Sequence, residues 1–167
     1  MFIAHAPAGY ITSRLLAPAF ARTGASYRSF VLCGMLGAVA PDIDLLWFVF
    51  VDHRQHSHHS YFTHLPVTWL LAMALSLLWM RRRPATGVLA FSFSLGGFGH
   101  MILDTVMGGI RWLAPLSDQT YVFFTPTSDF VGMWWFYFLF HWSFKLELAI
   151  TLAALLFWLK PHRTSQR

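Results

Sequence analysis

Histidine and aspartate side chains lie in and beside apolar segments of this chain. An acidic pair follows a proline in Pro41-Asp42-Ile43-Asp44, and a histidine-rich run extends from His53 to His64. His100 and Asp104 are four residues apart, and His5 lies near the N-terminus. Ionisable residues at membrane depth are costly and typically functional, and imidazole with carboxylate suits Zn²⁺ or a similar divalent ion. The sequence therefore predicts a metal site in a membrane protein.

Two of these motifs depend on helix geometry. On a helix His100 and Asp104 share one face and can chelate one ion, although a hydrogen-bonded pair that locks two helices fits the same spacing. Asp42 could cap a helix that restarts after Pro41, but two carboxylates exceed what one cap needs. A helix break at Pro41 lets Asp42 and Asp44 reach a common site, or leaves one as the partner of a ligating histidine.

The composition is that of a membrane protein. Of 167 residues, 56% are hydrophobic and 11% are charged, against about 25% charged in soluble domains. The single cysteine, Cys33, excludes an internal disulfide. The net charge is +5, but no basic stripe with interleaved aromatic residues is present, so we expect no direct binding of nucleic acid. The N-terminal segment lacks the basic leader of a signal peptide, and we expect it to be retained.

The elements that must position these residues are hydrophobic segments. We expect one all-α domain over residues 1–167, a polytopic membrane bundle whose segments lie at about 2–20, 30–51, 66–80, 85–107 and within 130–159. An aromatic stretch with Trp134, Trp135 and Tyr137 precedes the last helix and suits a membrane interface. A basic tail follows that helix.

Lys and Arg predict the orientation of the bundle. They lie between segments one and two, between three and four, and after five, at Arg22, Arg28, Arg81, Arg82, Arg83, Lys160, Arg163 and Arg167. These are alternate connections, so all can lie on one side, which the positive-inside rule makes cytoplasmic. We expect an outward N-terminus, a cytoplasmic C-terminus, and the histidine and aspartate motifs together near the outer leaflet.

The motifs in this order resemble a known family. An early His5, Pro41-Asp42-Ile43-Asp44, the run from His58 to His64 that ends in Thr-His, and the Gly96–Asp104 motif are similar to the YdjM-like inner-membrane metal-dependent hydrolases. The resemblance covers residues 5–116. It implies a protein of the bacterial inner membrane with a helical core like that of zinc-dependent phospholipase C.

The resemblance also implies a ligand set and a substrate class. The implied ligands of one to three ions, with zinc favoured, are His5, Asp42, Asp44, His59, His64, His100 and Asp104. His53, His56 and His58 are possible substitutes. The chain lacks the arginine that the family carries between the histidines of the loop motif, and Arg54 or Arg111 could contact phosphate in its place.

The leading functional hypothesis is a membrane-embedded hydrolase that cleaves a phosphoester of a lipid or lipid-linked substrate. In this hypothesis the metal activates water and Asp44 acts as general base. The alternative is a non-enzymatic metal-binding membrane protein, a transporter or sensor with a histidine-rich outer loop. A third possibility is a scaffold whose polar residues only lock helices. His141 and Glu147 are weaker candidates, since a spacing of six does not place them on one helical face.

Overall fold

The structure is a computed structural model that describes residues 3–124 and 139–160, and the described chain is helical. The predicted aromatic stretch at Trp134, Trp135 and Tyr137 and the end of the basic tail lie outside these residues. In chain order, the helices and 3₁₀ turns are α1 (His5–Leu16), η1 (Ala17–Thr23), α2 (Tyr27–Val39), η2 (Pro41–Ile43), α3 (Asp44–Phe50), η3 (His58–Ser60), η4 (Phe62–His64), α4 (Pro66–Met80), α5 (Pro84–Asp104) and α7 (Trp142–Leu159).

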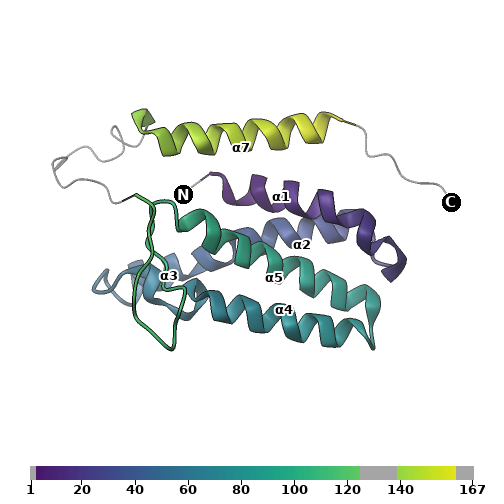
Figure 1. Ribbon diagram of the computed structural model, residues 1–167, viewed down its shortest axis with the longest axis horizontal. Coiled ribbons are helices and arrows are strands. Elements are labelled where there is room, and N and C mark those ends of the chain that lie inside the picture. The colour runs from purple at the N-terminus through teal and green to yellow at the C-terminus, as the bar shows by residue number, and fades with distance from the viewer. Residues whose placement is uncertain (1–2, 125–138, 161–167) are drawn as a thin grey trace.

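The long helices lie side by side and place their connections at two opposite ends (Figure 1). At one end are the connection between α1 and α2 and the turn between α4 and α5, which holds Arg81–Arg83. The end of α7 lies there too, since the Arg14 guanidinium donates to the Lys160 carbonyl at 2.6 Å. At the other end are α3, the histidine-rich loop and the segment after α5. The basic connections therefore share one end, as the sequence predicts.

The helices differ in whether they are long enough to cross a bilayer. By length and composition, α5 and α7 can each span a membrane, and α2 with the η2–α3 segment makes a third span if the pair, bent by 48°, is counted as one. The apolar helix α4 has 15 residues and α1 has 12, against about 20 for a span. Each of the five predicted segments contains a helix in the described residues, and two or three of these segments meet the length of a span, so five membrane spans remain a prediction.

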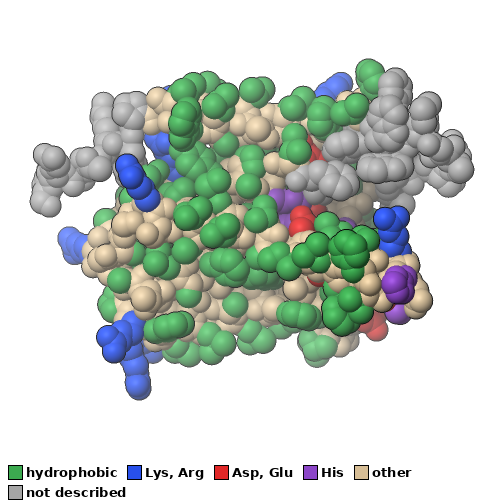
Figure 2. Space-filling model, turned by 180° about the vertical axis from the view of Figure 1, so that it is seen from behind, with side chains coloured by type: hydrophobic (Ala, Val, Ile, Leu, Met, Phe, Trp, Pro, Cys, Tyr) green, Lys and Arg blue, Asp and Glu red, His purple; other side chains and the backbone are tan. Residues whose placement is uncertain are grey.

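Small residues form the closest contacts between helices, a few large residues such as Phe30 and Met101 are buried beside them, and many other large apolar residues face outward. A Cβ added to Gly37 would lie 1.8 Å from the Phe93 carbonyl oxygen, and one added to Gly96 would lie 2.2 Å from that of Gly34. The exposed outer surface carries leucines such as Leu75 on α4, and apolar side chains spread across the face in Figure 2. Because lipid is as apolar as leucine, close backbone packing is the expected way to hold such helices together.

Prolines and polar caps set where the helices begin. Pro66 and Pro84 occupy the first turns of α4 and α5, where a missing amide N–H costs nothing. The Ser26 side chain accepts a hydrogen bond from the Ser29 amide and caps α2. His64 ends η4 two residues before Pro66 begins α4, and its Nε2 lies 3.7 Å from Asp104 Oδ2 at the end of α5.

Candidate metal centre

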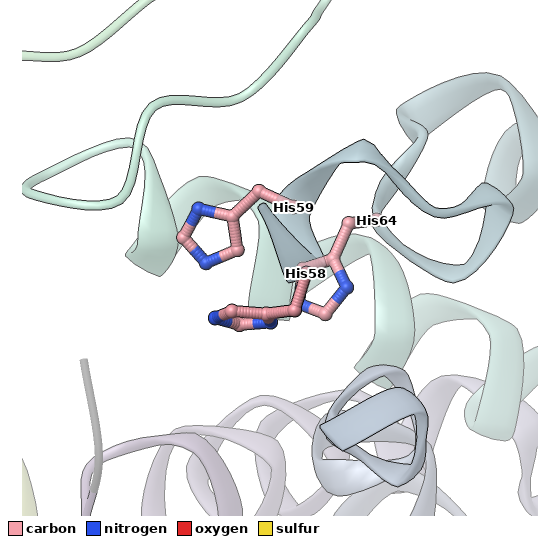
Figure 3. Close-up of side chains that lie close together, drawn as sticks. All are labelled: His58, His59 and His64. Atoms are coloured by element: carbon pink, nitrogen blue, oxygen red, sulfur yellow. The ribbon is translucent and has the colours of Figure 1, made fainter. Parts of the chain in front are cut away.

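The histidines and aspartates that the sequence singles out converge at one end of the bundle. His5 begins α1, Asp42 and Asp44 flank the break after α2, and His100 and Asp104 lie in the last turns of α5. The histidine-rich loop adds η3 and η4. Figure 3 shows the rings of His58, His59 and His64 close together beside the end of α5. Segments about one hundred residues apart thus form one site.

The break at Pro41 brings the two carboxylates into this site. The ring of Pro41 ends α2, and η2 reorients the chain by 48° before α3 begins. In a continuous helix, Asp42 and Asp44 would point to different faces. After the break, Asp42 Oδ1 lies 3.6 Å from His100 Nε2 and 3.8 Å from His64 Nε2, and Asp44 lies against the other nitrogen of His64.

Three histidine rings are each fixed through Nδ1. His100 Nδ1 donates to the Ala38 carbonyl at 2.7 Å, and His59 Nδ1 donates to the Gly108 carbonyl. His64 Nδ1 contacts the Asp44 carboxylate at 2.7 Å. A carbonyl or carboxylate oxygen can only accept, so the proton is on Nδ1 in each ring. Such bonds orient metal-ligating histidines and leave Nε2 available.

The Nε2 atoms of the same rings face carboxylate oxygens. Asp104 Oδ2 lies 3.1 Å from His100 Nε2, 3.4 Å from His59 Nε2 and 3.7 Å from His64 Nε2. With the proton on Nδ1, each Nε2 presents a lone pair to an oxygen that also presents lone pairs. These atoms repel one another unless a cation lies between them.

The spacing of these atoms fits a tetrahedral ion. Zinc bonds to nitrogen and oxygen are about 2.0–2.2 Å long, which places neighbouring ligand atoms about 3.3–3.5 Å apart in a tetrahedron. The distances from the Nε2 atoms of His64 and His100 to Asp42 Oδ1 and Asp104 Oδ2 range from 3.1 to 3.8 Å. Asp42, His64 and His100 also place one ligand atom each within 4.8 Å of one another. Asp42, His64 and His100 can therefore coordinate one ion after small adjustments, and Asp104 lies beside the two histidines.

Burial strengthens this assignment. His64 and His100 are fully buried, and neither Nε2 makes a hydrogen bond in the described chain. Buried polar atoms without a partner are rare and need an explanation, which a metal supplies here. Burial holds the pKa of His64 below its ordinary value, against the opposing effect of Asp44. The neutral imidazole that binds metals is favoured as a result.

Asp104 links this tetrahedral set to His5. Its Oδ1 lies 3.1 Å from His5 Nε2, while its Oδ2 faces the other histidines. The His5 ring stacks on that of His100 with centroids 3.7 Å apart. His5, His100 and Asp104 form a second group of potential ligands, and His58, His59 and His64 form a third. A bridging carboxylate between adjacent groups suits more than one ion.

Comparison with known proteins identifies the family. A family model described as YdjM inner membrane protein matches residues 1–164. The chain belongs to the YdjM inner membrane protein family. This match confirms the resemblance drawn from the motifs and extends it beyond residue 116. No curated protein and no solved structure matches the chain, so the phospholipase C-like core remains a prediction. Family membership and apolar helices together make this a membrane protein.

The loop of this YdjM family member divides its histidines into two sets. His59 and His64, both implied by the resemblance, reach the site. His58 joins them, with a side chain 26% exposed and Nδ1 3.6 Å from Asp44 Oδ1. His53 is exposed, and His56, 67% exposed, pairs with Asp52 instead. The sequence offered no periodicity in this loop to distinguish His58 from its neighbours.

Asp44 contacts His64, a candidate ligand, on the side away from the site. This is the second of the two roles that a helix break at Pro41 allows. Asp44 Oδ2 accepts hydrogen bonds from His64 Nδ1 at 2.7 Å and from Thr63 Oγ1 at 2.5 Å. This carboxylate therefore contacts the nitrogen of His64 that faces away from the other ligands. The contacts favour a role for Asp44 in orienting His64. The resemblance implies instead that Asp44 coordinates the metal directly.

The two candidate phosphate-binding arginines are placed differently. Arg111 donates to the Ser60 carbonyl at 2.5 Å and pairs with Asp118 at 3.2 Å. It therefore holds the η3 turn that carries the ligating histidines. Arg54 is exposed and has a positive φ of 64°. Neither guanidinium contacts a predicted ligand, so their predicted contact with phosphate has no direct support in the described geometry.

Glu147 and His141 each cap the N-terminal end of a helix. The fully buried Glu147 carboxylate of α7 accepts hydrogen bonds from the amides of Ile3 at 2.6 Å and Ala4 at 3.3 Å. These amides precede α1, so α7 caps the helix that begins with His5. His141 Nδ1 accepts from the Ser143 amide and caps α7. A lone acid in an apolar helix was the signal in the sequence, but its partner could not be read from spacing.

Proposed function

We propose that this protein is a membrane-embedded, metal-dependent hydrolase that cleaves a phosphoester of a lipid or lipid-linked substrate. The observation that carries the proposal is the set of three histidines fixed through Nδ1, whose Nε2 atoms face Asp42 and Asp104. Zinc is the favoured ion because the set consists of nitrogen and carboxylate oxygen at tetrahedral spacing.

The chemistry of the ligand set supports a hydrolytic site. Asp42, His64 and His100 would hold one ion, and Asp104 and His59 supply further candidate ligands beside them. A divalent ion bound there lowers the pKa of its water toward neutrality and offsets negative charge that develops on a phosphoryl group. A catalytic zinc ion keeps one position for water or substrate, and the three-residue group of Asp42, His64 and His100 would leave such a position.

His58 and Asp44 form the pair best placed to accept a proton. His58 is the most exposed of the three loop histidines at the site, and Asp44 Oδ1 lies behind it at 3.6 Å. In the proposed reaction, water attacks phosphorus, the ester P–O bond breaks, and His58 takes the proton of the water and passes it to the departing alkoxide, while Asp44 stabilises the imidazolium. This division of roles refines the expectation that Asp44 itself is the base.

The location of the site supports an amphiphilic substrate. It lies at the end of an apolar bundle, beside exposed apolar side chains such as Ile102 and Phe123. A lipid phosphoester could thus present its headgroup to the histidines while its chains remain in the bilayer. By the positive-inside rule, we place this end at the outer leaflet and the arginine-bearing connections in the cytoplasm.

Metal content and turnover measured together test the proposal. Detergent-purified wild-type protein should carry near-stoichiometric metal and release phosphate or a phosphorylated headgroup from phospholipids or lipid phosphates. His100→Ala and Asp104→Ala should lose both properties. His56→Ala is the matched control because His56 lies in the same loop but pairs with Asp52 outside the site. Retained turnover in either metal-depleted variant would refute the metal-dependent mechanism.

A metal transporter is the second candidate, supported by the histidine-rich loop. A transport path needs polar groups through the bundle, yet apart from Glu147, which caps α1, the buried polar residues in the described helices away from the site are serines such as Ser13, Ser76 and Ser92. Zinc flux into proteoliposomes distinguishes the two functions. Flux that His100→Ala abolishes, without any phosphoester cleavage by wild-type protein, would establish transport in place of hydrolysis.

A further inference from the structure

A narrow cavity extends from the candidate metal centre along the bundle. It has a volume of about 200 Å³ and lies between α1, α2 and α5. His5 and His100 line the cavity at the metal centre, and Ser13 on α1 and Gly96 on α5 line it farther along the helices. From His5 to Ser13 the helix rises about 12 Å. The cavity is therefore elongated and joined to the proposed catalytic site.

Small residues line this cavity from all three helices, namely Gly9, Ala38 and Gly99. A Cβ added to Gly9 would lie 2.7 Å from the Ala38 Cβ, so close packing already explains Gly9. A Cβ added to Gly99 would meet no atom within 4 Å, whereas those added to Gly37 and Gly96 would collide with backbone. Close helix packing thus explains Gly37 and Gly96, but it does not explain Gly99. The absence of a side chain at Gly99 leaves a space instead of a contact.

His5 supplies a polar atom that points to a ligand. It lines the cavity and is 1% exposed, and its Nδ1 makes no hydrogen bond in the described chain. Its other nitrogen contacts Asp104 at 3.1 Å. When Nε2 donates to that carboxylate, Nδ1 is an acceptor and can bind a hydroxyl of a ligand whose polar end lies at the metal centre.

The remaining wall is apolar and opens toward lipid. Leu95, Ile102 and Leu103 line it, and Ile102 is 52% exposed. At about 200 Å³ the cavity is smaller than a pocket for a drug-sized ligand, which holds about 300–1,000 Å³. One slender aliphatic chain, entering between α1 and α5, matches its size, its chemistry and its polar end.

We infer that this cavity binds the first carbons of one alkyl chain of the substrate, with the phosphoester at the His5 and His100 end. The inference rests on the proposed function and specifies its substrate as an alkyl phosphoester whose chain enters from the membrane. Gly99 is then a specificity-determining residue, since any larger side chain occupies the space that the chain needs.

Alkyl phosphates of graded length test the cavity. Protein loaded with Co²⁺ is titrated with methyl, propyl and hexyl phosphate, and binding is read from the cobalt absorption spectrum. Each methylene buried from water raises affinity about fourfold, so hexyl phosphate should bind wild-type protein at least tenfold more tightly than methyl phosphate. Gly99→Leu should still bind cobalt and methyl phosphate, but it should lose most of the extra affinity for hexyl phosphate. Gly99→Ala, which adds a single methyl group, should retain more of it.

Two further arms make the result decisive. Thr12→Trp narrows the cavity from α1 and should reproduce the effect of Gly99→Leu without altering α5. Dimethylallyl phosphate, compared with pentyl phosphate of the same five carbons, distinguishes a polyprenyl from a fatty chain. If both variants bind methyl phosphate and still bind hexyl phosphate more tightly by the wild-type factor, the cavity inference alone is overturned. Failure of wild-type protein to bind methyl phosphate would overturn the proposed phosphoester site as well.

Discussion

The role of Asp44 gives the sharpest prediction about the metal centre. Asp44→Asn keeps the size of the side chain and one oxygen acceptor for His64 Nδ1, but removes the negative charge 2.7 Å from that nitrogen. The charge makes His64 a stronger donor to a metal through Nε2. Loss of such a partner typically weakens metal binding 10–100-fold, which corresponds to about 1.4–2.7 kcal/mol. We expect a loss in this range with an intact fold.

The same loop offers a matched control. Asp52 contacts His56 Nδ1 at 2.7 Å, the same distance as in the Asp44–His64 pair, but the His56 ring is 67% exposed and lies outside the site. Asp52→Asn should therefore leave affinity unchanged. Competition with a chromophoric chelator in detergent measures zinc affinity for both variants and for wild-type protein.

Two outcomes would refute the assignment of Asp44. An affinity of Asp44→Asn equal to that of wild-type protein would show that the pair with His64 does not act on the metal. A loss well beyond 100-fold would show that Asp44 coordinates the ion itself, as the family resemblance implies. Equal losses in Asp44→Asn and Asp52→Asn would indicate a general effect of charge in the loop.

Three further predictions concern the helices and protons around the site. Glu147→Ala leaves two amides at the start of α1 without their acceptor; we expect a loss of about 1–3 kcal/mol per buried group, seen as a lower midpoint of thermal unfolding. Gly37→Ala should prevent folded protein from accumulating, because its Cβ meets backbone at 1.8 Å. Gly99→Ala should leave the midpoint unchanged or raise it by the equivalent of about 0.5–1 kcal/mol. Acid should weaken zinc binding in chelator titrations because protons compete for imidazole. Although burial opposes its charge, the negative charge of Asp104 and the hydrogen bond to the Gly108 carbonyl raise the pKa of His59, so competition there begins at a higher pH than for free histidine.

The sequence predicted the class of fold because an apolar composition with few charges directly indicates that the chain is surrounded by lipid. Apolar segments became helices, and alternate basic connections came to share one end. Pro41 marked the break because a missing amide and a fixed φ disrupt any helix. The lengths of α1 and α4 were less predictable, since their ends depend on tertiary contacts such as the cap that Glu147 provides from α7.

The site was predictable where helix geometry or motif order constrained it. His100 and Asp104 face the same point because they are one helical turn apart. The loop residues were harder, because an irregular backbone gives no period from which to infer direction. His58 faces the site while His56 turns to Asp52, a difference that only the loop conformation determines. The position of Asp44 behind His64 likewise required the bend at Pro41 in three dimensions.

The wide separation of the ligands along the chain has a consequence for assembly. His5 emerges from the ribosome first, and Asp104 follows 99 residues later. Early in synthesis His5 has no partner with which to bind a metal. A chain that stops before α5 lacks Asp104, the carboxylate at the centre of the site. Binding of the proposed ion would therefore be a late event, which requires that α1, the bent α2–α3 pair, the loop and α5 have all docked. A bound ion would then link segments across the first hundred residues and would stabilise only the fully assembled bundle.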